Sequence, residues 1–300
     1  MLDEFKNAFQ RHNNAHIQLI IINVVIFIAM GVLMVVAKMS VTQPIFQVVY
    51  DQFTLPSQLS EFINKPWTLL TYSFAHSFNY QFGKVGIFHI LMNMLVFYWF
   101  AKLFVEYLGS DKLVALYILG GLSGGLLYLL LFNTIPFFIV QPSILVGASA
   151  AVFAVVVAAA TLLPDYTFFL LFLGSVRIKY IAGFYIVISL LSSVGDNAGG
   201  EIAHLGGALM GFIYIKQLQS GVNWGGWITA TIDWFKNLFT AKPKVKITYR
   251  NKETPSSKKA STKSSISQDE IDVILDKISD GGYESLTKDE KEKLFNASKK

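Results

Sequence analysis

The chain has 300 residues and a net charge of +5; 53% of its residues are hydrophobic, only 15% are charged, and its mean hydropathy is +0.47. Because a soluble domain carries about 25% charged residues, this composition excludes an ordinary soluble protein, and the absence of cysteine excludes disulfides, a thiol nucleophile and zinc sites built on cysteine. The positive charge does not indicate nucleic acid as a partner, since the excess lies in one C-terminal segment. Several apolar runs approach or exceed the roughly 20 residues that cross a bilayer, so we expect an all-α polytopic membrane protein.

The first hundred residues predict two membrane spans separated by a long apolar loop. Residues 1–16 are polar and are expected to form a cytosolic N-terminus. Residues 17–37 are almost entirely apolar, too long for a signal-peptide core and without a small-x-small cleavage site, so we expect a retained helix. Residues 39–86 are rich in aromatic residues and interrupted by prolines, which favours a loop in the membrane interface. The second span is expected at residues 88–108.

Four further apolar runs complete a predicted six-helix membrane domain over residues 17–218. Residues 166–174 are apolar as well, but their length and the preceding Pro164-Asp165 favour an interfacial loop over a seventh span. The four spans are expected at residues 113–134, 144–163, 180–194 and 202–215. The fifth is short, and residues 202–215 are the core of a sixth span that is expected to start a few residues earlier.

The distribution of Lys and Arg predicts how the spans are oriented. With the N-terminus inside, the inner segments hold most of the basic residues and the outer segments hold only Lys65 and Lys84. We therefore expect both termini in the cytoplasm and spans two, four and six to run from outside to inside. Asp3 and Glu4 do not suit an Arg-rich mitochondrial presequence, so the simplest expected location is a plasma (inner) membrane, most simply bacterial.

Each of the three inward-running spans carries a polar group near its outer end. Ser149 lies on span four, His204 on span six, and His89 and Asn93 lie four residues apart on one face of span two. At a rise of about 1.5 Å per residue these groups share one depth within the first two helical turns. A lone serine in an apolar helix is usually a packing residue, but a histidine inside a membrane is costly and marks a functional candidate. Together the four groups favour catalysis.

The predicted chemistry is acyl transfer. Serine needs an adjacent base to become a nucleophile, and we expect His204 to act on Ser149 in this way. The developing oxyanion needs hydrogen-bond donors, for which the candidates are the Ser149 backbone N–H, the Asn93 amide and the His89 ring.

The nearest acidic residues to the predicted pair are Asp196 and Glu201. We assign both to the outer loop and rank them low as a third catalytic group, so we expect a Ser149–His204 dyad that needs no metal or other cofactor. Small residues every fourth position would let the two helices approach closely enough for the dyad to form. These residues are Ala150, Ala154 and Ala158 on span four, and Ala203, Gly207 and Gly211 on span six.

Three short motifs carry these groups in order along the chain: His89-Ile-Leu-Met-Asn93, Gly147-Ala148-Ser149-Ala150, and Ala203-His204 followed by Gly207 and Gly211. They resemble the His-x-x-x-Asn oxyanion motif, the Gly-x-Ser-Gly nucleophile motif and the last-helix histidine motif of the rhomboid family of intramembrane serine proteases. Phe153 falls where an aromatic ring usually stacks on the catalytic histidine of that family. The resemblance covers about residues 17–218.

This resemblance implies a six-helix bundle that hydrolyses peptide bonds in or near the transmembrane helices of single-pass membrane proteins, without metal or ATP. Span five and residues 195–200 would serve as gate and lid. Two positions depart from the family pattern. Ala150 replaces the second glycine of the nucleophile motif, which would crowd the fourth helix or reflect a subfamily variant, and Thr68 follows Trp67 where many members have arginine.

The C-terminal segment predicts three further parts. Aromatic residues within 219–240 favour an amphipathic helix on the inner membrane surface. Residues 241–265 hold eight Lys or Arg against one acid and predict a basic, flexible linker attracted to anionic lipid rather than to nucleic acid. Residues 266–300 predict a small two-helix cytosolic module whose second helix starts with a capping box from Thr287 to Glu290. We expect that module to bind a cytosolic partner or another part of the chain.

Two other functions stay open at this point. A non-catalytic rhomboid-like protein would bind and escort membrane client proteins; the retained Ser149 and His204 argue against it, whereas Ala150 keeps it open. A transporter or channel would use the His and Asn side chains in a polar path. That hypothesis predicts polar residues continuing toward the inner side, where spans two, four and six become apolar.

Overall fold

The structure, a computed structural model, describes residues 6–9, 13–40, 43–78, 85–170, 174–239 and 268–297. Several stretches named above fall wholly or partly outside these residues, among them the N-terminal segment 1–16, residues 79–84 of the loop 39–86, and the basic segment 241–265. The chain divides into two compact units, Met1–Lys242 and Pro243–Lys300.

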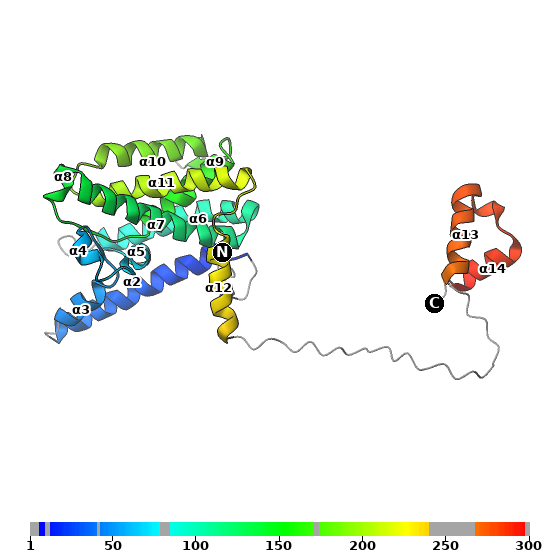
Figure 1. Cartoon of the computed structure of the whole chain (residues 1–300), viewed down its shortest axis with the longest axis horizontal. Helices are drawn as coiled ribbons and strands as arrows, with labels where there is room; N and C mark the ends of the chain where they lie inside the picture. Colours follow the sequence, from blue (N-terminus) through cyan, green and yellow to red (C-terminus); the bar gives the residue numbers. More distant parts are fainter. Residues whose placement is uncertain are drawn as a thin grey trace. The chain divides into compact units, whose positions relative to one another are not determined.

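Six apolar helices in the described part of the first unit occupy the positions of the six predicted spans (Figure 1). Three of them are long and apolar enough to cross a membrane. They are α2 (Ala15–Met39), α6 (Val85–Leu108) and α7 (Ser110–Thr134). The others are α9 (Ser149–Leu162), α10 (Ile178–Ser192) and α11 (Ala198–Gln219). The predicted all-α membrane bundle is confirmed.

The predicted start of the fourth span at residue 144 is wrong. Residues Ile144–Leu145 form a short strand, β2, which pairs antiparallel with β1 (Leu55–Pro56). The chain then turns at Gly147, whose φ of +146° is rarely adopted by residues with a side chain. A helix cannot extend back through this glycine, so α9 starts at Ser149.

Short elements connect the long helices. The segment that we expected to be an interfacial loop at 166–174 takes part in a hairpin of β3 (Thr167–Leu170) and β4 (Gly174–Arg177). Helix α12 (Gly226–Phe239) lies within the predicted interfacial segment 219–240. The remaining short elements are α3 (Gln43–Tyr50), α4 (Leu59–Phe62), α5 (Thr68–Thr71), η1 (Tyr72–Phe74) and α8 (Pro136–Ile139).

Helices α7, α9 and α11 form the centre of the bundle and contact one another closely (Figure 1). A Cβ added at Gly207 or Gly211 of α11 would collide with the backbone carbonyl of Ala150 or Ala154, respectively. The predicted close approach of spans four and six through small residues is therefore confirmed. It brings the backbone that follows Ser149 against the backbone that follows His204.

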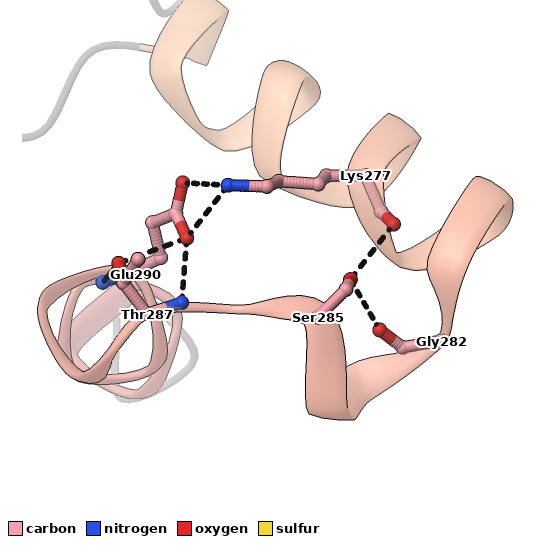
Figure 2. A network of polar contacts seen from close by, with 5 residues as sticks. All are labelled: Lys277, Gly282, Ser285, Thr287 and Glu290. Atoms are coloured by element: carbon pink, nitrogen blue, oxygen red, sulfur yellow. Dashed lines mark hydrogen bonds and ion pairs between the residues drawn. The ribbon is translucent and has the colours of Figure 1, made fainter.

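The second unit consists of α13 (Gln268–Gly281), the single turn η3 (Tyr283–Ser285) and α14 (Lys288–Ala297). The predicted capping box is present: Thr287 N–H donates to Glu290 Oε2 over 2.7 Å, and Glu290 N–H donates to the Thr287 hydroxyl oxygen over 3.4 Å. Figure 2 shows how Lys277 of α13 reaches the same carboxylate, at 2.9 Å from Oε1. One glutamate thus starts α14 and ties it to α13.

Candidate active site

Ser149 is positioned by the turn that precedes α9. Gly147 N–H donates to the Tyr72 carbonyl oxygen over 3.0 Å, which ties this turn to the outer loop. Ser149 is the first residue of the helix, where a backbone N–H has no acceptor within the helix. A Cβ at Gly147 would lie 3.5 Å from Ser149 Oγ and 3.6 Å from His89 Cε1. The absence of a side chain at Gly147 therefore leaves space between these two groups.

All four predicted site residues line one cavity of about 180 Å³. Helices α6, α9, α10 and α11 each contribute to its wall. No hydrogen bond joins Ser149 to His204 within the described residues, and such bonds are often long before a substrate binds. The lining residues are His89, Met92, Asn93, Val96, Ser149, Val152, Phe153, Val156, Tyr185 and His204.

The His204 ring is held on one face by Phe153. The two rings are stacked, with centroids 4.1 Å apart and an interplanar angle of 11°. The predicted stacking of Phe153 on the histidine is confirmed. The edge of the Phe153 ring in turn meets Tyr185 of α10 at 5.5 Å. This packing fixes the plane of the imidazole.

The Nδ1 atom of His204 faces two polar groups that the sequence analysis did not assign to the site. Glu201 Oε2 lies 3.1 Å from it and Ser189 Oγ lies 3.2 Å from it. Our assignment of Glu201 to the outer loop is wrong, because α11 begins at Ala198 and carries Glu201 in its first turn. Residues three apart in a helix share a face, so the spacing Glu201-x-x-His204 would have predicted this contact had Glu201 been assigned to the helix.

The two residues predicted to bind the oxyanion lie on α6 beside a buried polar network. Asn93 Nδ2 donates to the His89 carbonyl oxygen over 2.9 Å and keeps a second N–H. The ring of His89 meets the ring of His76 edge to face, with centroids 5.8 Å apart. His76 Nε2 lies 3.2 Å from Asn23 Oδ1 of α2, and since an amide oxygen only accepts, the imidazole N–H is the donor.

Asn23 extends this network to α7. Its Nδ2 donates to the Tyr117 hydroxyl oxygen over 3.0 Å, and that hydroxyl donates to the Ser73 carbonyl oxygen over 2.7 Å. Asn23 is fully buried, and His76 is 1% exposed. This network was not among the predictions above, although an asparagine inside an apolar span is a signal of a polar partner.

The two departures from the family pattern have local explanations. A Cβ at Gly124 of α7 would lie 2.6 Å from the Cβ of Ala150, so the missing side chain on α7 makes room for the extra methyl group. Thr68 is fully buried and its hydroxyl donates to the Lys65 carbonyl oxygen over 2.6 Å. The threonine thus closes a turn of the outer loop at the position where an arginine was expected.

The described residues contain no group of three or more His, Asp or Glu side chains that could hold a metal ion. What the site offers chemically is a hydroxyl, an imidazole with a carboxylate on its Nδ1, and hydrogen-bond donors on a third helix. This set suits acyl transfer through a serine ester.

Comparison with known proteins identifies two families along the chain. The family model of the Rhomboid domain matches residues 64–220, more than half of the chain, and that of a family of unknown function, DUF6576, matches residues 258–300. RHOMBOID-like protein 6, mitochondrial, from Arabidopsis thaliana is 30% identical over 168 residues, which is 53% of this chain and 47% of that protein. RHOMBOID-like protein 12, mitochondrial, from the same plant is 30% identical over 165 residues, 51% of this chain and 47% of that protein. The chain therefore spans about half the length of the curated relatives it matches.

Proposed function

The chain belongs to the rhomboid family, and from this membership we propose that it is a serine endopeptidase that hydrolyses peptide bonds in or near the transmembrane helices of single-pass membrane proteins. One observation carries the proposal: Ser149 and His204, on different helices, line one small cavity together with His89 and Asn93. A protein that only binds membrane clients has no need for a nucleophile, a base and oxyanion donors around one space.

The proposed reaction uses Ser149 as nucleophile and His204 as general base and acid. Ser149 Oγ attacks the carbonyl carbon of the scissile bond while His204 Nε2 takes the hydroxyl proton. The imidazolium then gives that proton to the leaving nitrogen, so the C–N bond breaks, the amine fragment departs and an ester remains on Ser149. Water attacks the ester, with one proton passing through His204 back to Ser149 Oγ, and the second fragment leaves as a carboxylic acid.

The negative charge of each tetrahedral intermediate falls on the former carbonyl oxygen. The Ser149 N–H at the start of α9, the free N–H of the Asn93 amide and the His89 ring are the proposed donors to it. Removing one such donor typically costs about 100- to 1,000-fold in kcat. The inner wall of the cavity is apolar, formed by Val96, Val152 and Val156 among others, and would take a small apolar side chain of the substrate.

The proposed setting is a plasma membrane, most simply a bacterial one, with both termini in the cytoplasm. The excess of Lys and Arg in the inner segments supports this orientation. The proposed partners are the lipid bilayer, single-pass membrane substrates and a cytosolic protein for residues 266–300, with no role for nucleic acid. Cell fractionation and reporter fusions at both termini test the location, which matters because the two Arabidopsis relatives are named as mitochondrial.

The deciding experiment is cleavage of a generic transmembrane substrate by the purified protein in liposomes. Wild type is compared with Ser149→Ala and His204→Ala, and products are identified by mass spectrometry. We expect one specific cut that both variants lose. An equal cut by the variants, or substrate binding without any cut by the wild type, would contradict the proposal, and the second result would favour a client-binding protein.

A further inference from the structure

The carboxylate of Glu201 lies against the imidazole that the proposed reaction uses as a base. Glu201 Oε2 and His204 Nδ1 are 3.1 Å apart, and their side chains are only 17% and 14% exposed. At this degree of burial an ion–dipole or ion–ion contact is screened far less than at an open surface. The contact therefore bears directly on the protonation of His204.

A carboxylate can only accept a hydrogen bond, so the proton in this contact belongs to His204 Nδ1. A neutral imidazole carries one N–H. With Nδ1 protonated, Nε2 holds the free electron pair that a general base needs. The opposite tautomer, with the proton on Nε2, cannot take a proton from Ser149.

The hydroxyl of Ser189 could stabilise either tautomer of His204. Its hydroxyl oxygen lies 3.2 Å from the same Nδ1 atom and belongs to a residue that is only 1% exposed. A hydroxyl can donate as well as accept. Without Glu201, Ser189 could donate to a bare Nδ1 and so favour the tautomer that is inactive as a base.

The position of Glu201 also favours its negative charge. It lies in the first turn of α11, where the unpaired N–H groups and the helix dipole stabilise an anion. Its own N–H donates to the Asn197 carbonyl oxygen over 3.1 Å, which fixes the backbone at this turn. The carboxylate is therefore held in place on the same helix as the histidine.

We propose that Glu201 is a positioning residue that holds His204 in the tautomer whose Nε2 accepts the Ser149 proton, and that it stabilises the imidazolium formed during the reaction. This role rests on the proposed protease function. It adds Glu201 to the expected Ser149–His204 dyad as a third group that acts through the histidine and never touches the substrate.

The test compares wild type with Glu201→Gln, Glu201→Asp and the control Glu61→Gln, all as full chains in liposomes. Glu61 is an exposed acid on α4 that takes no part in the cavity. We expect Glu201→Gln to lower kcat about 10- to 100-fold with KM changed less than about threefold. This loss is smaller than the roughly 10⁴-fold loss for the corresponding change in a buried Ser-His-Asp triad, because the Gln oxygen can still accept from Nδ1–H. Glu201→Asp should recover part of the loss, and Glu61→Gln should match wild type.

A further readout separates positioning from a structural effect. Nitrogen-15 NMR of ring-labelled histidine should find His204 as the Nδ1–H tautomer in wild type and a mixture in Glu201→Gln.

The outcomes distinguish this role from the proposed function. A Glu201→Gln variant with wild-type kcat and tautomer would overturn the role of Glu201 while leaving the protease intact. A kcat loss of the same size in Glu61→Gln would overturn it as well. Absence of cleavage by the wild type, with the tautomer still changed by Glu201→Gln, would overturn the proposed function and leave the positioning of His204 standing.

Discussion

Gly124 of α7 lies directly opposite the methyl group of Ala150 on α9: a Cβ at Gly124 would come within 2.6 Å of the Ala150 Cβ and 2.7 Å of the Ala203 carbonyl oxygen. The residue that replaces the glycine of the nucleophile motif is thus matched by a glycine on the neighbouring helix. Ala150 directly follows Ser149 on α9, and Ala203 directly precedes His204 on α11, so both close contacts of Gly124 lie beside the proposed catalytic residues.

This pairing predicts that Gly124→Ala lowers stability by about 1–3 kcal/mol, the usual cost of overpacking a core, and reduces the cleavage rate by displacing α9. Ala150→Gly alone should keep the site intact and cost about 1 kcal/mol through its helix propensity. The double variant should recover part of the Gly124→Ala loss, because only one of the two close contacts is relieved. Thermal unfolding in detergent and cleavage rates measure both effects, and strictly additive losses would contradict the pairing.

The backbone contact between α9 and α11 predicts a large effect at Gly207. A Cβ there would collide with the carbonyl of Ala150, which cannot move without moving Ser149. Gly207→Ala should therefore lower the unfolding temperature and abolish most of the cleavage activity. The matched control is Gly183→Ala on α10, where an added Cβ meets nothing within 4 Å. Equal effects of the two substitutions on unfolding and cleavage would contradict this account.

Asn23 predicts a coupling between α2 and the proposed oxyanion site. Asn23→Ala would leave His76 Nε2 without its partner, and an unsatisfied buried polar group costs about 1–3 kcal/mol. The Tyr117 hydroxyl would lose the donor on Asn23 but keep its own bond to the Ser73 carbonyl oxygen. Because the His76 ring contacts His89, we expect a lower kcat with a smaller change in KM. The control Ile22→Ala removes an exposed side chain from the same helix. A full loss of stability with unchanged kcat would show that the network is structural only.

The C-terminal unit predicts a pH dependence of its own. The Thr287 backbone N–H, together with Lys277 and the Thr287 hydroxyl, lowers the pKa of Glu290 to about 2 (Figure 2). The pKa in the unfolded chain is about 4.3, so this contribution to stability is complete above that pH and is lost as the pH falls toward about 2. Carbon-13 NMR titration of the Glu290 carboxyl in the full chain measures this, with backbone shifts of 268–297 reporting unfolding. In Glu290→Gln the pH-dependent part between these values should disappear, and a midpoint near 4.3 in wild type would contradict the prediction.

Much of the membrane bundle could be predicted because its signal is local. Apolar runs located the six helices, and polar residues near one end of three of these runs marked the cavity that Ser149, His204, His89 and Asn93 line. The residues at which the helices start were harder to predict. The apolar run that begins at residue 144 contains a strand, a turn and the start of a helix, and hydropathy alone does not distinguish these three elements. The backbone conformation of Gly147 is what separates the strand from the helix.

The partners behind the site could not be predicted for a different reason. Asn23 and His76 are 53 residues apart in the chain, and Asn23 and Tyr117 are 94 apart. Nothing local to any of these residues encodes such contacts, which depend on how α2 packs against α7 and the outer loop. The contact between Glu201 and His204 is local, because the two residues are three apart in the chain. It was missed only because we assigned Glu201 to the outer loop and not to the helix.

In the mechanism proposed above, the late start of α9 also determines how water reaches Ser149. The helix has 14 residues and is about 21 Å long, shorter than a hydrocarbon core of about 30 Å. In the proposed orientation, with the inner end of α9 at the cytoplasmic boundary, Ser149 lies roughly 9 Å beneath the opposite boundary, the difference between these two lengths. The acyl-chain length of the host lipid would then set the depth of the recess through which hydrolytic water descends, and we expect membrane thickness to affect turnover.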